Sequence, residues 1–130
     1  MQGVEEDILQ DLKELADLIS QYTYLIECAG EAVTYPPEYL TDEYLVPECQ
    51  AKTWIYVKKE QGRVFLFAES ESLLVKGALA LLQEIYYGRS EAEVRHYTCG
   101  LLRYEGFYKH FTQEQLRGLK YIFKQIGHGY

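Results

Sequence analysis

A strongly apolar segment at residues 71–87, ESLLVKGALALLQEIYY, constrains the fold of this chain more than any other feature. Its apolar side chains are not confined to one stripe, which is typical of a helix that is buried over most of its surface. Ser70 or Ser72 is suited to cap the start of this helix, and Gly88 to end it. Gly77 lies in its interior, where glycine costs about 1 kcal/mol relative to alanine. A close approach of the helix backbone to a sheet would explain that glycine.

Two β-rich segments precede this helix. Residues 53–58 (TWIYVK) and 63–68 (RVFLFA) alternate between the two faces of a strand, and the short turn KEQG separates them. This pattern predicts a β-hairpin. Residues 44–46 (YLV) are expected to add a third short strand.

Helical periodicity is also found in three other segments, residues 4–30, 91–97 and 113–126, and a further short helix is expected near 99–105. The first segment is either one helix ending at Gly30 or two helices with a bend near Ser20 and Gln21. Ser90 and Thr112 are suited to cap the later helices, and Gly106 is expected to be a break.

The order of these elements is helices, then a hairpin, then helices. It predicts an α+β fold with an antiparallel three-stranded sheet covered by helices. A length of 130 residues predicts one domain, residues 1–130.

The charge of the chain is unevenly distributed. The net charge is −7, with 12 acidic residues and one basic residue in positions 1–49, against 8 acidic and 12 basic residues in positions 50–130. An acidic chain is a poor candidate for binding a nucleic-acid backbone. The asymmetry suits a protein partner, although a solvated face on the acidic N-terminal helix explains it equally well.

No segment of the sequence has the length and hydropathy of a signal peptide or a membrane span. The three cysteines lie far apart, at positions 28, 49 and 99, without CxxC spacing. We therefore expect reduced thiols, no structural zinc and a cytoplasmic protein. His96 and Cys99 form a pair spaced by three residues, which alone is a weak metal signal. No bound cofactor or metal is predicted.

Cys49 is the cysteine whose sequence position is least typical of a residue packed in a hydrophobic core. Cys28 lies on an amphipathic helix among apolar residues, and Cys99 precedes an apolar segment, so both are expected to be packed and inert. Cys49 instead follows Pro47 and precedes a predicted strand, at the tip of a loop. Glu48 would disfavour its thiolate and Lys52 would favour it. Local sequence alone leaves open whether this thiol is reactive.

Two sequence blocks carry a family resemblance. LVPECQAKTWI (45–55) resembles the cysteine loop of SufE-type sulfur acceptors, in which valine, any residue, glycine and cysteine are followed by glutamine or glutamate, serine, two residues and tryptophan. FAESESLLVKGALALLQEIYYGRSEAEV (67–94) resembles the acidic-serine turn and VKG helix of that family, and residues 106–126 resemble its last helix. The resemblance covers most of the chain in order.

This resemblance implies a SufE- and CsdE-like α+β domain, similar to the iron–sulfur scaffold IscU. It implies a protein that accepts sulfane sulfur from a SufS- or CsdA-like cysteine desulfurase, stimulates that enzyme and passes sulfur to a SufBCD-like scaffold or another acceptor. The pyridoxal phosphate belongs to the desulfurase. Cys49 would be the acceptor thiol. Candidate loop or partner contacts are Val46, Glu48, Gln50, Lys52, Trp54, Glu69, Ser70 and Lys76.

The chain departs from the family pattern at several positions. Glu48 replaces the glycine before the cysteine and Ala51 replaces the serine after it, while Glu69 replaces an aspartate and Gln115 an arginine. These changes leave an alternative open, in which the chain is a binding module that regulates or scaffolds a desulfurase without transferring sulfur. A thiol redox enzyme is disfavoured because no resolving cysteine lies at CxxC spacing.

Overall fold

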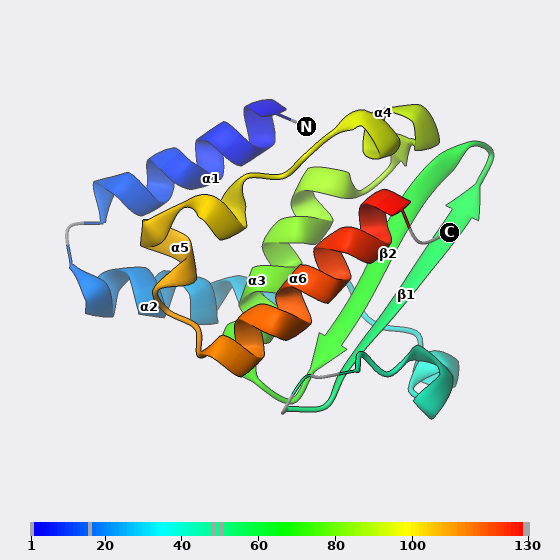
Figure 1. Ribbon diagram of the computed structural model, residues 1–130, viewed down its shortest axis with the longest axis horizontal. Helices are drawn as coiled ribbons and strands as arrows, with labels where there is room; N and C mark the ends of the chain where they lie inside the picture. The colour runs from blue at the N-terminus through cyan, green and yellow to red at the C-terminus, as the bar shows by residue number, and fades with distance from the viewer. Residues whose placement is uncertain (1, 16, 48, 50, 129–130) are drawn as a thin grey trace.

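The computed structural model describes residues 2–15, 17–47, 49 and 51–128 (Figure 1). Its helices are α1 (Gln2–Glu14), α2 (Leu18–Cys28), α3 (Leu73–Tyr86), α4 (Glu91–His96), α5 (Glu105–Tyr108) and α6 (Gln113–His128). Its strands are β1 (Thr53–Glu60), β2 (Arg63–Ser70) and β3 (Arg89–Ser90). Four 3₁₀ turns connect them, η1 (Ala29–Glu31), η2 (Pro37–Tyr39), η3 (Asp42–Tyr44) and η4 (Leu101–Arg103). The predicted α+β order is confirmed.

The sheet has three antiparallel strands in the order β1-β2-β3. Its main part is the predicted hairpin, which closes through Gln61 and Gly62, both at positive φ (53° and 75°). Two positive φ values in a two-residue loop match the twist of the flanking strands. The assignment of the third strand to residues 44–46 was wrong, because that segment makes only a single bridge, Leu45 with Trp54, and β3 is the third strand.

The hairpin divides its side chains cleanly between two faces. Along β2 every second residue is buried, and these residues are Val64, Leu66, Ala68 and Ser70. This inner face packs on α3. On the outer face Tyr56 pairs with Phe67, and Tyr39 from η2 stacks on Tyr56 with ring centroids 3.9 Å apart. This aromatic contact attaches η2, which precedes Cys49 in the chain, to the outer face of the sheet.

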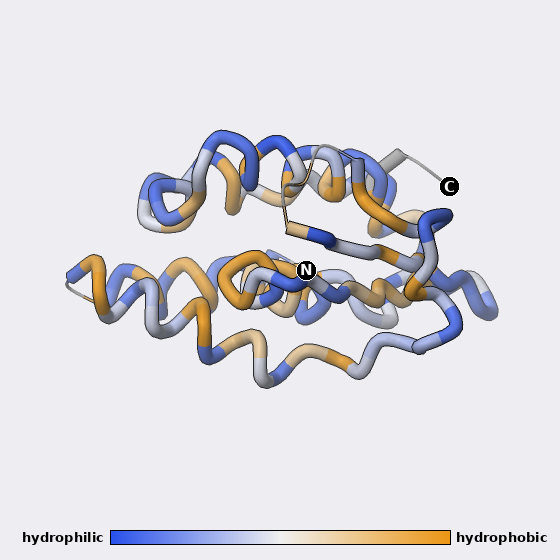
Figure 2. The backbone as a smooth tube through the Cα atoms, turned by 90° about the horizontal axis from the view of Figure 1, so that it is seen from below, coloured by the Kyte–Doolittle hydropathy of each residue, from blue (hydrophilic) through white to orange (hydrophobic). Residues whose placement is uncertain are grey.

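Helix α3 is the centre of the core, as its all-round apolar sequence predicted. Eleven of its residues are buried, from Leu74 to Tyr86. Ser72 caps it, accepting a hydrogen bond from the Val75 N–H at 3.2 Å. In Figure 1 the hairpin runs along one side of the molecule, with α1, α2 and α5 at the other and α3 between them. Along the outer helices in Figure 2, hydrophilic and hydrophobic residues alternate, as expected for amphipathic helices.

Gly77 permits a close helix crossing, although the neighbour is α2 and not the sheet. A Cβ atom at this position would lie 1.8 Å from the backbone oxygen of Leu25. The predicted close approach is confirmed, and the predicted partner was wrong because Gly77 faces the Leu25 backbone of α2.

The first helical segment forms two helices, with α1 ending at Glu14 and α2 beginning at Leu18, earlier than the bend expected near Ser20 and Gln21. Asp17 caps α2 by accepting a hydrogen bond from the Ser20 N–H at 2.8 Å. Gln21 is buried, and its amide donates to the carbonyl oxygens of Leu12 and Leu15 at 3.3 and 3.1 Å. Gln21, which was expected at a bend, therefore supplies hydrogen-bond donors to backbone carbonyl oxygens at the C-terminal end of α1.

The predicted caps of the later helices are confirmed. Ser90 and Glu93 form a capping box at α4, and Thr112 and Gln115 exchange hydrogen bonds of 3.1 and 2.9 Å at α6. Gly106 is not a break but lies inside α5, where a Cβ atom would lie 2.5 Å from the Tyr104 ring.

Replacing Gly77 with alanine tests the crossing of α2 and α3. Because the added methyl would overlap the Leu25 carbonyl, we expect Gly77→Ala to lower the free energy of unfolding by at least about 2 kcal/mol in denaturant titrations. Gly30→Ala is the matched control, since nothing lies within 4 Å of a Cβ at that position. Equal stabilities of the two variants would contradict the crossing.

Candidate functional site

The segment that carries Cys49 is anchored at both ends by the hairpin. The Val46 N–H donates to the Thr53 carbonyl oxygen at 2.7 Å, and the Glu71 N–H donates to the Lys52 carbonyl oxygen at 2.9 Å. Val46 is buried, whereas Lys52 is exposed. The open end of the hairpin therefore fixes where this loop begins and ends. We call residues 46–52 the cysteine loop.

The Cys49 thiol is seated against helix α6 and is only partly exposed. A Cβ atom at Gly118 would lie 3.0 Å from Cys49 Sγ and 3.2 Å from Cys49 Cβ. The glycine therefore leaves a notch in α6 that accommodates the cysteine. The sequence suggested a thiol at an exposed loop tip, and the structure corrects this, because the cysteine packs on α6 and part of its side chain is covered.

A pair of buried hydroxyls lies beside the thiol. Cys49 Sγ is 3.3 Å from Thr53 Oγ1, which is 2.8 Å from Ser70 Oγ and donates to the Ala51 carbonyl oxygen at 3.1 Å. Ser70 was among the predicted site residues, whereas Thr53 was missed. The signal that would have revealed it is the strand alternation, which places Thr53 on the inner face, on the same side as the buried residues of β2.

Other predicted contact residues lie on the opposite face of the sheet. Trp54 and Glu69 are opposed in the register of β1 and β2, one position along from Thr53 and Ser70. Because side chains alternate along a strand, those of Trp54 and Glu69 point to the other face of the sheet. Glu69 forms an ion pair with Lys76 at 3.1 Å and accepts a hydrogen bond from the Ser70 N–H at 2.9 Å. This group ties the end of β2 to the beginning of α3, and it is not joined to the thiol.

Two of the predicted contacts, Glu48 and Gln50, lie outside the described residues. Ala51, which replaces a family serine, is described, and its carbonyl oxygen accepts the Thr53 hydrogen bond. Gln115, which replaces a family arginine, belongs to the cap of α6.

The other two cysteines are in environments that disfavour a thiolate. Burial, reinforced by the nearby Glu31 carboxylate, raises the pKa of the Cys28 thiol to about 11. Burial raises the pKa of the Cys99 thiol to about 12, against the opposing effect of the Leu101 backbone N–H. Both thiols remain protonated at neutral pH, consistent with the packing roles predicted for them.

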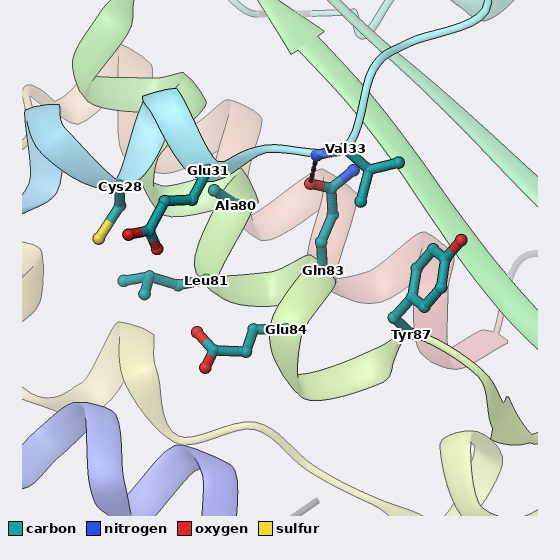
Figure 3. A pocket seen from close by; sticks show the side chains of 8 residues that line it. All are labelled: Cys28, Glu31, Val33, Ala80, Leu81, Gln83, Glu84 and Tyr87. Atoms are coloured by element: carbon teal, nitrogen blue, oxygen red, sulfur yellow. Dashed lines mark hydrogen bonds between the residues drawn. The ribbon is translucent and has the colours of Figure 1, made fainter.

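Two surface hollows lie on the described part of the chain, and Cys28 lines one of them. One of about 250 Å³ lies beside Cys28, with Glu31 and Glu84 around it and the Val33 N–H bonded to Gln83 Oε1 at 3.1 Å (Figure 3). The other, of about 280 Å³, lies between the start of the cysteine loop, β1 and α6; its lining includes Val46, Val57 and Tyr121. Of these two hollows, the second is the one formed by the elements that hold Cys49.

Neither a metal centre nor a membrane span is found in residues 2–15, 17–47, 49 and 51–128. In this part of the chain no group of three or more histidine, cysteine, aspartate or glutamate side chains is placed to hold a metal ion. None of the described helices combines the length and the apolar character needed to cross a bilayer.

Thiol alkylation tests whether Cys49 is the most reactive of the three cysteines. We expect iodoacetamide at neutral pH to modify Cys49 first, because the thiolate is the reacting form and the other two thiols have raised pKa values. Peptide mass spectrometry of the native chain measures this order. The denatured chain, in which all three thiols are equally accessible, is the control, and faster labelling of Cys28 or Cys99 would contradict the assignment.

Adding a methyl group at Gly118 tests whether the contact with α6 holds the Cys49 side chain in place. We expect Gly118→Ala to displace the cysteine side chain and to raise its alkylation rate several-fold, with the fold retained because alanine favours helix. The control is Lys120→Ala, an exposed position on the same helix. An unchanged alkylation rate in the Gly118 variant would show that the notch does not hold the thiol.

Comparison with a solved structure supports the fold described above. The chain resembles a solved structure described as a hypothetical protein from Thermus thermophilus, with a TM-score of 0.77, 26% sequence identity, and coverage of 95% of this chain and 90% of that one. This similarity supports the predicted α+β architecture.

Sequence relatives agree. A 63-residue stretch, 48% of this chain, is 32% identical to the cysteine desulfuration protein SufE of Wigglesworthia glossinidia brevipalpis, and it spans 44% of that relative's length. The family model described as SufE, Fe-S metabolism associated domain, matches residues 6–129. This match extends over almost the entire chain, which therefore belongs to the SufE family.

Proposed function

We propose that this protein accepts sulfur from a cysteine desulfurase onto Cys49 and delivers it for iron–sulfur cluster assembly. The observation that carries the proposal is the family match, which spans residues 6–129 and so includes Cys49. The family description refers to Fe–S metabolism, and the relative named above is a cysteine desulfuration protein. Of the three cysteines, Cys49 alone combines partial exposure, a loop position and a side-chain hydroxyl within hydrogen-bond distance of its sulfur.

The chemistry is a thiol–persulfide exchange. The Cys49 thiolate attacks the outer sulfur of a persulfide on the desulfurase, and a new S–S bond forms as the old one breaks. The electron pair of the broken bond remains on the desulfurase cysteine, which leaves as a thiolate. The product is a persulfide on Cys49, with no net oxidation and no further reactant. A scaffold thiol or another acceptor then takes the outer sulfur in the same way.

The anchored loop suits this exchange. The hydrogen bonds of the Val46 N–H to Thr53 and of the Glu71 N–H to Lys52 hold the two ends of the cysteine loop against the hairpin. Loop ends that are already ordered lower the conformational entropy lost on docking. Between transfers, the contact with Gly118 covers part of the thiol and protects it from oxidation.

An assay with a desulfurase tests the proposal. The protein is incubated with a cysteine desulfurase from the same organism and with cysteine, and sulfur addition is mapped by peptide mass spectrometry. We expect the mass of one sulfur atom on Cys49, faster alanine release by the desulfurase, and loss of both in Cys49→Ser. Cys28→Ser and Cys99→Ser are matched controls and are expected to accept sulfur normally.

The Cys49→Ser variant also distinguishes sulfur transfer from the alternative function, regulation or scaffolding of a desulfurase without transfer. If Cys49→Ser still stimulates the desulfurase, the protein is a regulator or scaffold and does not transfer sulfur. If the wild-type chain shows neither an adduct nor stimulation, both functions are wrong.

A further inference from the structure

Thr53 and Ser70 form a buried pair whose geometry is set by the sheet. They are directly opposed in the register of β1 and β2, with exposed fractions of 0% and 6%, and their hydroxyl oxygens are 2.8 Å apart. Buried hydroxyls need hydrogen-bond partners, since an unpaired one is costly. The partners available here determine which hydroxyl donates.

Ser70 is the donor of the pair. Its oxygen accepts the Ser72 N–H at 3.1 Å, and its own hydrogen has Thr53 Oγ1 as its acceptor. The reverse arrangement would leave the Ser70 hydrogen without an acceptor among the described residues. Thr53 Oγ1 therefore accepts from Ser70, and the Thr53 hydrogen is free for one of two acceptors, the Ala51 carbonyl oxygen at 3.1 Å or Cys49 Sγ at 3.3 Å.

These two acceptors correspond to two protonation states of the cysteine. When Cys49 is a thiol, its S–H donates to Thr53 Oγ1 and the Thr53 hydroxyl donates to the Ala51 carbonyl oxygen. When the thiol proton has passed to solvent, the sulfur is only an acceptor, and the Thr53 hydroxyl can turn from the carbonyl oxygen to the sulfur. The change needs a rotation of one hydroxyl and no movement of a heavy atom.

We propose that Thr53 is a positioning residue that stabilises the thiolate of Cys49 through its hydroxyl group, with Ser70 orienting that hydroxyl. A hydrogen bond to a charged acceptor is stronger than one to a neutral acceptor, so it favours the ionised form. The inference deepens the proposed function and rests on it only in assuming that this thiolate is the nucleophile. It also supplies a hydroxyl near the cysteine in a chain that has Ala51 where the family pattern has serine.

Charged and titratable groups on the surrounding elements do not provide this stabilisation by direct contact. Lys52 precedes β1, Glu71 follows β2, and Arg117 and Tyr121 lie beside Gly118 on α6. Within the part of the chain that the structure describes, none of them is hydrogen-bonded or ion-paired to Cys49, whose thiol has Thr53 as its hydrogen-bond partner.

The test is the pH profile of Cys49 alkylation by iodoacetamide in the full chain, without a desulfurase. We expect Thr53→Val, which keeps the shape and removes the hydroxyl, to move the midpoint upward by about one pH unit. Thr53→Ser, which keeps the hydroxyl, should retain the wild-type midpoint. Thr34→Val makes the same chemical change at an exposed position and should have no effect. If the valine variant does not fold, Thr53→Ala makes the same comparison.

Two features of the profile distinguish an electrostatic role from a structural one. The rate reached at high pH reports how accessible the thiol is, whereas the midpoint reports how readily it ionises. A wild-type midpoint in Thr53→Val overturns the proposal, even if the high-pH rate changes, because Thr53 would then only hold the loop. Since no desulfurase is used, this result stands apart from any failure of sulfur transfer.

Discussion

The register of the β1–β2 hairpin is the constraint on which the site depends. It places Thr53 opposite Ser70 at the open end of the hairpin, and the same end anchors the cysteine loop through Val46 and Glu71. Three residues beyond Ser70, α3 begins. A slip of one residue would turn Thr53 to the outer face and remove the partner of the Cys49 thiol. The tight turn at Gln61 and Gly62 fixes that register far from the site.

The site rests on a packed support, to which the segment carrying Cys49 is attached. The support is the hairpin packed on α3, itself held close to α2 by Gly77. The hairpin end also anchors the segment that places Cys49 against Gly118. The seat combines the notch at Gly118 with the hydrogen bond between the Cys49 thiol and Thr53. The same contact covers part of the thiol at rest, which suits a group that would carry a reactive persulfide.

Local sequence patterns predicted the parts of the fold that local interactions determine. The hairpin, the buried helix α3 and the caps at Ser72, Ser90 and Thr112 followed from periodicity and capping. The errors arose where contacts between residues far apart in the sequence determine the local structure. Gln21 was expected at a bend but satisfies the carbonyls that end α1, and residues 44–46 were expected to form a strand but meet β1 at one bridge. Cys49 was proposed from the family pattern. The place of Thr53 beside it became visible only from the strand register, and that of Gly118 only from the packing of α6. The predictions for Glu48 and Gln50 remain predictions.

The most direct test of sulfur acceptance by Cys49 is a single turnover. A desulfurase carrying one persulfide, freed of cysteine, is mixed with an equal amount of this protein, and the sulfur on every cysteine of both proteins is followed over time. We predict that sulfur lost from the desulfurase appears one for one on Cys49, before it reaches any other thiol. Sulfur that stays on the desulfurase, or that appears first on Cys28 or Cys99, would contradict this role of Cys49.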